Sequence, residues 1–290
     1  MQYVSVVHHQ ATRWGLLHEG RVHLAAATPD HPATLLAALQ AHRATDRARI
    51  LAEARETPAL DEVELLAPIP RPPRNIMCLG LNYAEHARES QQAKGQELAL
   101  PEHPVVFTKA TSSVTGPVAD IPLDPEVTTQ LDWEVELAVV IGVGGRHIPE
   151  HRALEHVFGY TVINDLSARD LQFRHKQFFL GKSLDGGCPM GPGIVPADLI
   201  PDPHALRLWC DVNGERQQDG HTSDQVFRVA DTIARLSAVM TLEPGDIIAT
   251  GTPSGVGFAQ EPPRFLQPGD VVECGVEGIG TLRNRIVPAT

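Results

Sequence analysis

Two carboxylates stand two positions apart inside an apolar, β-branched run of the chain. The run extends from Leu131 to Gly142 and contains Glu134 and Glu136 among Val, Leu and Ile residues. Such a run predicts a buried or half-buried strand, in which residues i and i+2 point to the same face. Two adjacent buried anions need a cation between them, and a hard divalent metal ion favours carboxylate oxygens. The spacing fits equally well a solvated face of an edge strand.

A third acidic residue ends the next apolar run. Residues 156–164 again predict a strand, and Asp165 follows where that strand gives way to a loop. Loops beyond strand ends often carry catalytic groups, because a rigid scaffold aims them. Three carboxylates around Mg²⁺ or Mn²⁺ leave coordination positions for water and substrate, which is typical of a catalytic ion. Alternatively, Asp165 caps the helix or turn that follows it.

A histidine and a glutamate three residues apart form the next candidate pair. His86 and Glu89 follow a short apolar run, Gly80 and the potential helix cap Asn82, so they share one face of a predicted helix. A carboxylate bound to one imidazole nitrogen strengthens the other as a base for activating water. A solvent-exposed His-Glu pair explains the same spacing.

The composition is that of a chain with one large core and a smaller module. It has 290 residues and a net charge of −12, without long Lys/Arg clusters, which argues against nucleic acid or an anionic membrane as partner. No apolar stretch is long enough for a spanning helix, and no signal peptide is visible. The four cysteines are scattered without a Cys-x-x-Cys pair, so we expect reduced thiols and a cytoplasmic protein.

The elements that must position these residues form two parts. Residues 1–65 predict short strands and an Ala-rich helix near Pro32 to Glu56, and the proline-rich stretch 67–74 predicts a linker. We therefore expect a small N-terminal domain over 1–70 and a catalytic domain over 71–290. Irregular strands with few helices favour a β-rich α+β fold over a doubly wound sheet. Strands are expected at 75–80, 104–109, 131–142, 158–164, 206–212, 246–250 and 271–276, and helices near 83–92, 150–157 and 226–240.

Six short motifs in fixed order resemble the fumarylacetoacetate hydrolase superfamily from about residue 74 onward. Individually each is a modest signal, but their order makes the resemblance specific. The motifs are Gly80-x-Asn82-Tyr83-x-x-His86-x-x-Glu89; Phe107-x-Lys109 with Gly116-Pro117; Glu134-x-Glu136; Asn164-Asp165-x-Ser167-Ala168-Arg169-Asp170-x-Gln172; Gly181-Lys182-Ser183-x-Asp185; and Gly251-Thr252-Pro253-x-Gly255-Val256.

The resemblance implies a fold, a metal site and an assembly. It implies a mixed β-roll or sandwich catalytic domain with a small N-terminal α+β domain, commonly as a homodimer. It also implies one Mg²⁺ or Mn²⁺ per subunit, with Glu134, Glu136 and Asp165 as ligands, and His86 with Glu89 as a water-activating dyad. Lys182 matches a cationic catalytic group beside the metal, although an exposed lysine fits the sequence too. Tyr83, Arg169, Gln172 and Thr252 match substrate-binding positions, and Thr252 also fits a plain turn.

The chemistry of these groups predicts an enzyme that acts on a 2-oxo acid. A 2-oxo acid can chelate an open metal site through its carboxylate and keto oxygens, which stabilises an enolate when a bond at C3 breaks. Hydrolysis of a C–C bond in an acylpyruvate, a 2,4-dioxo acid, is the first prediction. Oxaloacetate decarboxylation, or isomerisation or dehydration in aromatic or sugar-acid catabolism, uses the same enolate. A metabolite-binding protein without turnover is a further alternative. Residues 84–100 are candidates for a closing lid.

Overall fold

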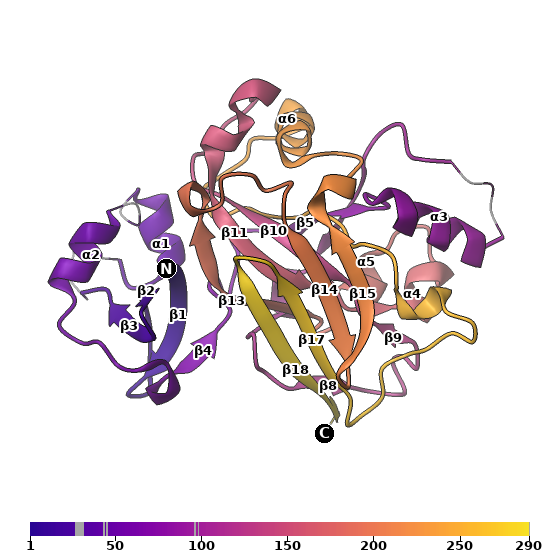
Figure 1. Cartoon of the computed structure of the whole chain (residues 1–290), viewed down its shortest axis with the longest axis horizontal. Coiled ribbons are helices and arrows are strands. Elements are labelled where there is room, and N and C mark those ends of the chain that lie inside the picture. Colours follow the sequence, from indigo (N-terminus) through magenta and orange to yellow (C-terminus); the bar gives the residue numbers. More distant parts are fainter. Residues whose placement is uncertain (27–31, 43, 45, 96, 98, 290) are drawn as a thin grey trace.

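The described part of the chain folds into two large β-sheets that pack against each other and a two-stranded sheet of β9 and β12, with short helices around them (Figure 1). This computed structural model describes residues 1–26, 32–42, 44, 46–95, 97 and 99–289. The larger sheet has the strand order β3-β2-β1-β13-β11-β10-β16-β5-β6, with β4 paired to β1 and β7 paired to β13. The second has the order β15-β14-β17-β18-β8. The predicted β-rich α+β class is therefore confirmed.

The N-terminal strands join the larger sheet at one edge. β1 pairs with β13 at a single position, Tyr3 opposite Ile194, and along its length with β2. The predicted domain boundary near residue 70 stays a proposal, because the larger sheet runs across it. The N-terminal elements are β1 (Gln2–His8), β2 (Ala11–His18), β3 (Arg21–Leu24), α1 (Leu35–Gln40), α2 (Arg47–Glu53), η1 (Leu60–Glu62) and β4 (Glu64–Leu66).

Two N-terminal predictions differ from the structure. The single helix expected near residues 32–56 is two short helices, because His42 adopts a positive φ of 54° just after α1. The expected linker is packed, since Ala67 and Ile69 are buried in a hydrophobic cluster. Proline prevents regular hydrogen bonding there, but it does not prevent burial.

Most of the predicted strands of the catalytic part are present, with shifted ends. The 131–142 run is interrupted: Trp133 and Glu134 lie between β9 and β10. The strands of this part are β5 (Ile76–Gly80), β6 (Val105–Lys109), β7 (Val114–Thr115), β8 (Ile121–Leu123), β9 (Leu131–Asp132), β10 (Val135–Ile141), β11 (Val157–Asn164), β12 (Ser167–Ala168), β13 (Cys188–Pro196), β14 (Arg207–Val212), β15 (Glu215–His221), β16 (Ile247–Ala249), β17 (Val271–Val276) and β18 (Gly280–Pro288).

Helices are short and lie around the sheets. The segment expected as a helix near 150–157 is a 3₁₀-helix, and two short helices after β12 were not predicted. The helices are α3 (Ala84–Ala93), η2 (Thr111–Ser113), η3 (Glu150–His156), α4 (Arg169–Arg174), α5 (Phe179–Lys182), η4 (Ala197–Leu199), η5 (Thr222–Asp224), α6 (Val229–Val239) and η6 (Gly257–Ala259). Among the described residues, none of the helices has the length and apolar character that crossing a bilayer requires.

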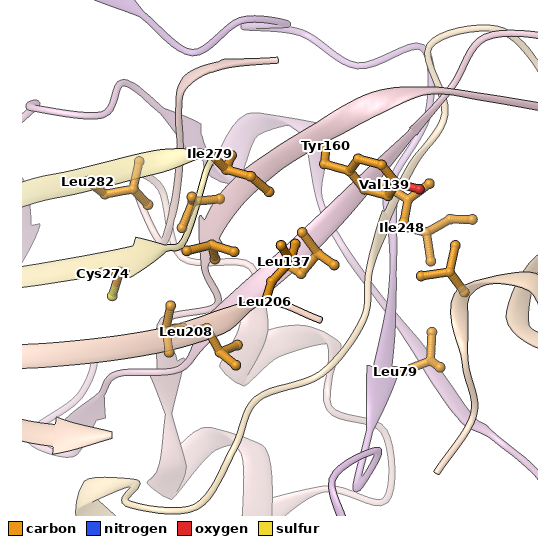
Figure 2. Packing of buried hydrophobic residues seen from close by; sticks show 14 of the residues in the cluster. Leu79, Leu137, Val139, Tyr160, Leu206, Leu208, Ile248, Cys274, Ile279 and Leu282 are labelled. Atoms are coloured by element: carbon orange, nitrogen blue, oxygen red, sulfur yellow. The ribbon is translucent and has the colours of Figure 1, made fainter. Parts of the chain in front are cut away.

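β10 lies at the centre of the structure and is buried on both faces. It pairs with β11 on one side and β16 on the other, which excludes the edge-strand alternative for this run. Leu137 and Val139 belong to the cluster between the two sheets. In Figure 2 Val139 lies beside Tyr160 of β11, its partner in the strand pairing, and Leu137 lies toward Leu206 and Leu208. Ala138 and Val140 alternate with them and face a second cluster. Glu136 points to the same face of β10 as Ala138 and Val140.

Candidate metal centre and active site

The structure brings the three predicted metal ligands together. Glu134 precedes β10, Glu136 lies within it, and Asp165 follows β11. Antiparallel pairing of β10 with β11 places Val135 opposite Asn164, and the Asp165 amide donates to the Glu134 carbonyl at 2.8 Å. One carboxylate oxygen from each of the three acids lies within 4.8 Å of those of the other two, and all three residues are buried. The strand register therefore creates the acidic cluster.

Glu134 is held in place although it lies outside the strand. The chain departs from the larger sheet at β9, which pairs with β12 instead. The Glu134 amide donates to the side-chain oxygen of Asn164 at 3.0 Å, which replaces a ladder hydrogen bond. Glu134 and Glu136 thus approach each other through a strand break, where the sequence predicted one continuous strand.

Two buried lysines lie against the cluster. Lys182 Nζ is 2.7 Å from Glu134 Oε2 and 2.7 Å from Asp165 Oδ2. Lys109 Nζ donates to Asp165 Oδ1 at 2.7 Å and to the Leu166 carbonyl at 3.1 Å. Lys182 was predicted to lie beside the metal ligands, whereas no role was predicted for Lys109. Its position at the end of the apolar β6 run, in one of the ordered motifs, was the available signal.

Arg169 is held by an aspartate that the sequence analysis missed. Arg169 Nε donates to Asp132 Oδ2 at 2.8 Å, and Asp132 also accepts from the amides of Gly257 and Phe258 at 2.7 and 3.1 Å. Arg169 Nη2 forms a buried ion pair with Glu134 Oε1 at 2.7 Å. Because Arg169 also lines the cavity, its guanidinium group can donate a hydrogen bond to a substrate oxygen.

The electrostatics separate the two glutamates. Burial opposes ionisation of Glu134, yet Lys182 and then Arg169 outweigh it and hold the pKa of this carboxyl well below its ordinary value. For Glu136, burial comes first and the charges of Asp165 and Glu134 second, and together they raise its pKa well above the ordinary value. The pKa of Lys182 is raised because Asp165 and Glu134 outweigh its burial.

Glu136 provides the test of whether a metal ion fits. Its side chain is 1% exposed, and it forms no ion pair within the described part of the chain. The Gly251 amide donates to its Oε2 at 2.7 Å, which leaves most of the negative charge uncompensated. A buried triad of hard oxygen donors with one unneutralised carboxylate fits a divalent cation such as Mg²⁺ or Mn²⁺.

The predicted dyad is formed on α3. His86 Nδ1 lies 3.3 Å from Glu89 Oε2, and His86 Nε2 lies 3.4 Å from the Ser90 hydroxyl. Glu89 is fixed from the other side, because the Gly255 amide donates to its Oε1 at 2.9 Å. With Glu89 as acceptor, the proton of a neutral His86 resides on Nδ1, and Nε2 is the basic nitrogen, which accepts a long hydrogen bond from Ser90.

A small cavity of about 50 Å³ connects α3 with the acidic cluster. Several predicted residues line it: His86, Glu134, Arg169, Gln172, Lys182 and Thr252. Thr252 accepts a hydrogen bond from Gln218 at 2.8 Å, which fixes its hydroxyl. Tyr83, expected to bind substrate, is instead buried in the core, and its hydroxyl accepts from Gln225 at 3.3 Å. Of the lid candidate at 84–100, Gln96 and Leu98 lie outside the described residues.

The cavity also has walls that the sequence analysis did not single out. Ser90 and Lys94 line it, together with Phe107, Phe173, Phe178 and Phe258. The signal for the first two was the helix period, because Ser90 and Lys94 follow His86 at intervals of four residues. The four cysteines, all described, are free and buried, as expected for reduced thiols.

Comparisons with known proteins place the chain in a family. The family profile described as fumarylacetoacetate (FAA) hydrolase C-terminal matches residues 75–287. The chain is 54% identical over 228 residues to oxaloacetate tautomerase YisK of Bacillus subtilis, which covers 79% of this chain and 74% of that protein. It is 43% identical over 272 residues to the human mitochondrial oxaloacetate tautomerase FAHD2A, covering 92% of this chain and 84% of that one.

A solved structure with metal and ligand is also similar. Maleylpyruvate hydrolase from Sphingobium sp. SYK-6, in complex with manganese(II) and pyruvate, superposes with a TM-score of 0.79 at 27% identity. The alignment covers 100% of both chains. The similarity therefore extends over the N-terminal part as well as over the acidic cluster.

Proposed function

Because the chain belongs to the fumarylacetoacetate hydrolase family, whose members include oxaloacetate tautomerases, isomerases and hydrolases, we propose that it is a divalent-metal-dependent enzyme that moves a proton at C3 of a 2-oxo acid. The reaction we propose is the keto–enol tautomerisation of oxaloacetate. The observation that carries the proposal is the buried triad of Glu134, Glu136 and Asp165 beside a histidine–glutamate pair.

Glu134, Glu136 and Asp165 would hold the metal ion. When bound, a divalent cation draws electron density from the keto oxygen of a 2-oxo acid and so acidifies the protons at C3. Lys182 lies between two of these carboxylates and faces the cavity, so its ammonium group can donate a hydrogen bond to the oxygen on which negative charge grows.

His86 is the proposed acceptor of the C3 proton. Its Nε2 is the basic nitrogen and exchanges the long Ser90 hydrogen bond for the C3 proton, while Glu89 holds Nδ1–H and stabilises the imidazolium that forms. The C–H electron pair becomes the C2–C3 double bond and the carbonyl pair moves to the C2 oxygen. That oxygen takes a proton from solvent to complete the enol, and the His86 imidazolium returns its proton to solvent. The reverse sequence converts enol to ketone, so the dyad serves both directions.

Cavity size and relatives both favour a short acid. A volume of about 50 Å³ holds only a few water molecules, at roughly 10–15 Å³ each, and suits a compact substrate better than a long acyl chain. Two relatives at 54% and 43% identity are oxaloacetate tautomerases. A small-molecule 2-oxo acid therefore stays our proposed partner.

C–C hydrolysis of an acylpyruvate is the second candidate. It was the first prediction from the sequence, and the His86–Glu89 pair is equally suited to removing a proton from water. The similar structure of maleylpyruvate hydrolase supports this candidate at the level of the fold, at 27% identity. Hydrolysis needs an attacking water beside the substrate, whereas tautomerisation does not.

The decisive experiment follows the loss of enol absorbance after dissolving crystalline enol-oxaloacetate, with Mg²⁺ or Mn²⁺ and with EDTA. Pyruvate release from oxaloacetate and from acetopyruvate is measured in parallel to detect decarboxylation and hydrolysis. His86→Ala should lower the tautomerisation rate by about 10²- to 10⁴-fold, as expected for loss of a general base. The exposed Glu85→Gln on the same helix serves as a matched control.

Each outcome selects one function. Metal-dependent enol loss without pyruvate release supports tautomerisation. Pyruvate release from acetopyruvate at a higher kcat/KM than enol loss would replace it with hydrolysis, and carbon dioxide release would replace it with decarboxylation. Binding of oxalate without any turnover would favour the non-catalytic alternative.

A further inference from the structure

Lys94 places an additional cation at the cavity. It follows the last residue of α3 and caps that helix, in one row with His86 and Ser90 at four-residue spacing. All three residues line the cavity. Although Lys94 is exposed as a whole residue, its side chain therefore reaches the edge of the site.

The contacts of the Lys94 ammonium group are aromatic. Nζ lies 4.4 Å from the ring centroid of Phe173 and 5.7 Å from that of Phe258. Arg169 also stacks on Phe258, with Cζ 4.4 Å from the same centroid. Aromatic faces attract cations but do not neutralise them. Within the described residues, Lys94 has no carboxylate at ion-pair distance.

The electrostatic surroundings of Lys94 are positive. Partial burial first, and then the charge of Arg169, lower the pKa of Lys94 below its ordinary value, and Lys182 adds to this. Glu134 opposes these effects but is itself paired with Lys182 and Arg169. The missing interaction partner of Lys94 is therefore an anion.

We propose that Lys94 is the counterion of the second carboxylate of a dicarboxylic 2-oxo acid, and that it makes the site select diacids over monoacids. The proposal rests on the proposed function for the position of the first carboxylate and the keto group. A neutral distal group would leave Lys94 uncompensated beside Arg169. The distal carboxylate removes that repulsion, so Lys94 is a specificity-determining residue.

The test compares two substrates that differ only in the distal charge. Oxaloacetate and its 4-methyl ester are assayed for enol-to-keto conversion with wild type, Lys94→Met and Lys94→Arg. Arg88→Met removes the same charge from an exposed position of α3 that does not line the cavity, and serves as the control. A second readout is calorimetric binding of malate and lactate to the Mn²⁺-loaded protein, because these share a 2-hydroxy acid and differ in the distal carboxylate.

Lys94→Met should lower kcat/KM for oxaloacetate by about 10- to 100-fold, the size expected for a hydrogen bond to a charged group, and change the ester by about twofold or less. Lys94→Arg should restore most of the preference, and malate should lose affinity while lactate does not. Equal losses on both substrates, or an unchanged ratio of malate to lactate affinity, would overturn the proposal.

Failure of the proposed function gives a different pattern. A wild-type protein that tautomerises neither substrate refutes the tautomerase assignment, while the malate-to-lactate ratio still decides the role of Lys94. Conversely, if the Lys94 variants are active and their preference for oxaloacetate over its ester is unchanged, the tautomerase assignment stands and only the proposed role of Lys94 is refuted.

Discussion

Replacing Glu136 by glutamine should stabilise the metal-free protein and destabilise it relative to wild type when metal is present. Glu136 is 1% exposed, and its neighbours Asp165 and Glu134 raise its pKa after burial. At an effective dielectric constant of about 20, two unit charges 4.8 Å apart repel by about 3 kcal/mol. Two carboxylates repel Glu136 and one ammonium, Lys182, attracts it. With the attraction by Lys182 taken as equal to one of the two repulsions, the net repulsion is on the order of 3 kcal/mol.

The effect depends on pH with a defined sign. Because the folded-state pKa of Glu136 is raised, the folded protein prefers the protonated form. The stability difference between the variant and wild type is therefore small below the ordinary glutamate pKa of about 4.3 and grows as pH rises toward the folded-state value. Each pH unit across that window contributes about 1.4 kcal/mol.

Bound metal should make wild type more stable than Glu136→Gln, which reverses the order expected without metal. A ligand that binds only the folded state at about 100 times its Kd adds about 2.7 kcal/mol to the free energy of unfolding. Wild type should gain this stabilisation with Mn²⁺, and Glu136→Gln should gain little, because one of three carboxylate ligands is gone.

Urea denaturation at pH 5, 6, 7 and 8, with EDTA or with Mn²⁺, measures both effects. The exposed Glu126→Gln is the matched control and should follow wild type throughout. A metal-free Glu136→Gln protein no more stable than wild type at pH 8 would show that Glu136 is not a repelled carboxylate. Equal stabilisation of both proteins by Mn²⁺ would remove Glu136 from the ligand set.

Three further outcomes are expected. Asp132→Asn should lower the free energy of unfolding by about 3–5 kcal/mol in urea titrations, because it removes one of the two carboxylates that pair with the buried Arg169; a loss below 1 kcal/mol would contradict this. Lys182→Met should bind Mn²⁺ more tightly in calorimetry, since a competing cation is removed, yet turn over about 10²-fold more slowly or worse; weaker Mn²⁺ binding would refute the competition. Light scattering should give twice the 31.5 kDa chain mass if the expected homodimer forms, and a monomer would refute that prediction.

Long apolar runs were the predictable part of the fold. The runs that became β10 and β11 were found because both faces of these strands are buried, so nearly every residue is apolar. Their ends were less predictable. Trp133 is apolar and fits a strand by pattern, but pairing of β9 with β12 takes the chain out of the larger sheet before it.

Strands with unusual composition were missed. β13 contains Pro189, Pro192 and Pro196 together with two glycines, a composition typical of loops. It is nevertheless a strand of the larger sheet, because it pairs with β11 through an irregular register and with β1 and β7 at single or double positions. These contacts are long-range, and no local propensity encodes them.

The acidic cluster could be predicted from the sequence, whereas the residues that hold it in place could not. Charge inside an apolar run violates the local pattern, so Glu134 and Glu136 stand out in the sequence itself. Lys109 and Asp132 violate nothing locally, since a lysine or an aspartate at a strand end is ordinary. Their roles exist only because distant segments bring Asp165 and Arg169 to them.

The pairing of charges in the site explains why we assign substrate choice to Lys94 and not to the three acidic residues of the metal site. Every carboxylate of the cluster except Glu136 is matched by a buried cation, so the inner site is set up for the metal and for the end of the substrate shared by all 2-oxo acids. Discrimination must come from a group beyond that shared end. Lys94, on the helix that also carries His86, lies at the cavity edge with no carboxylate partner in the described chain. Coupling the base and the distal cation through α3 would align C3 with His86 only when a second carboxylate is bound.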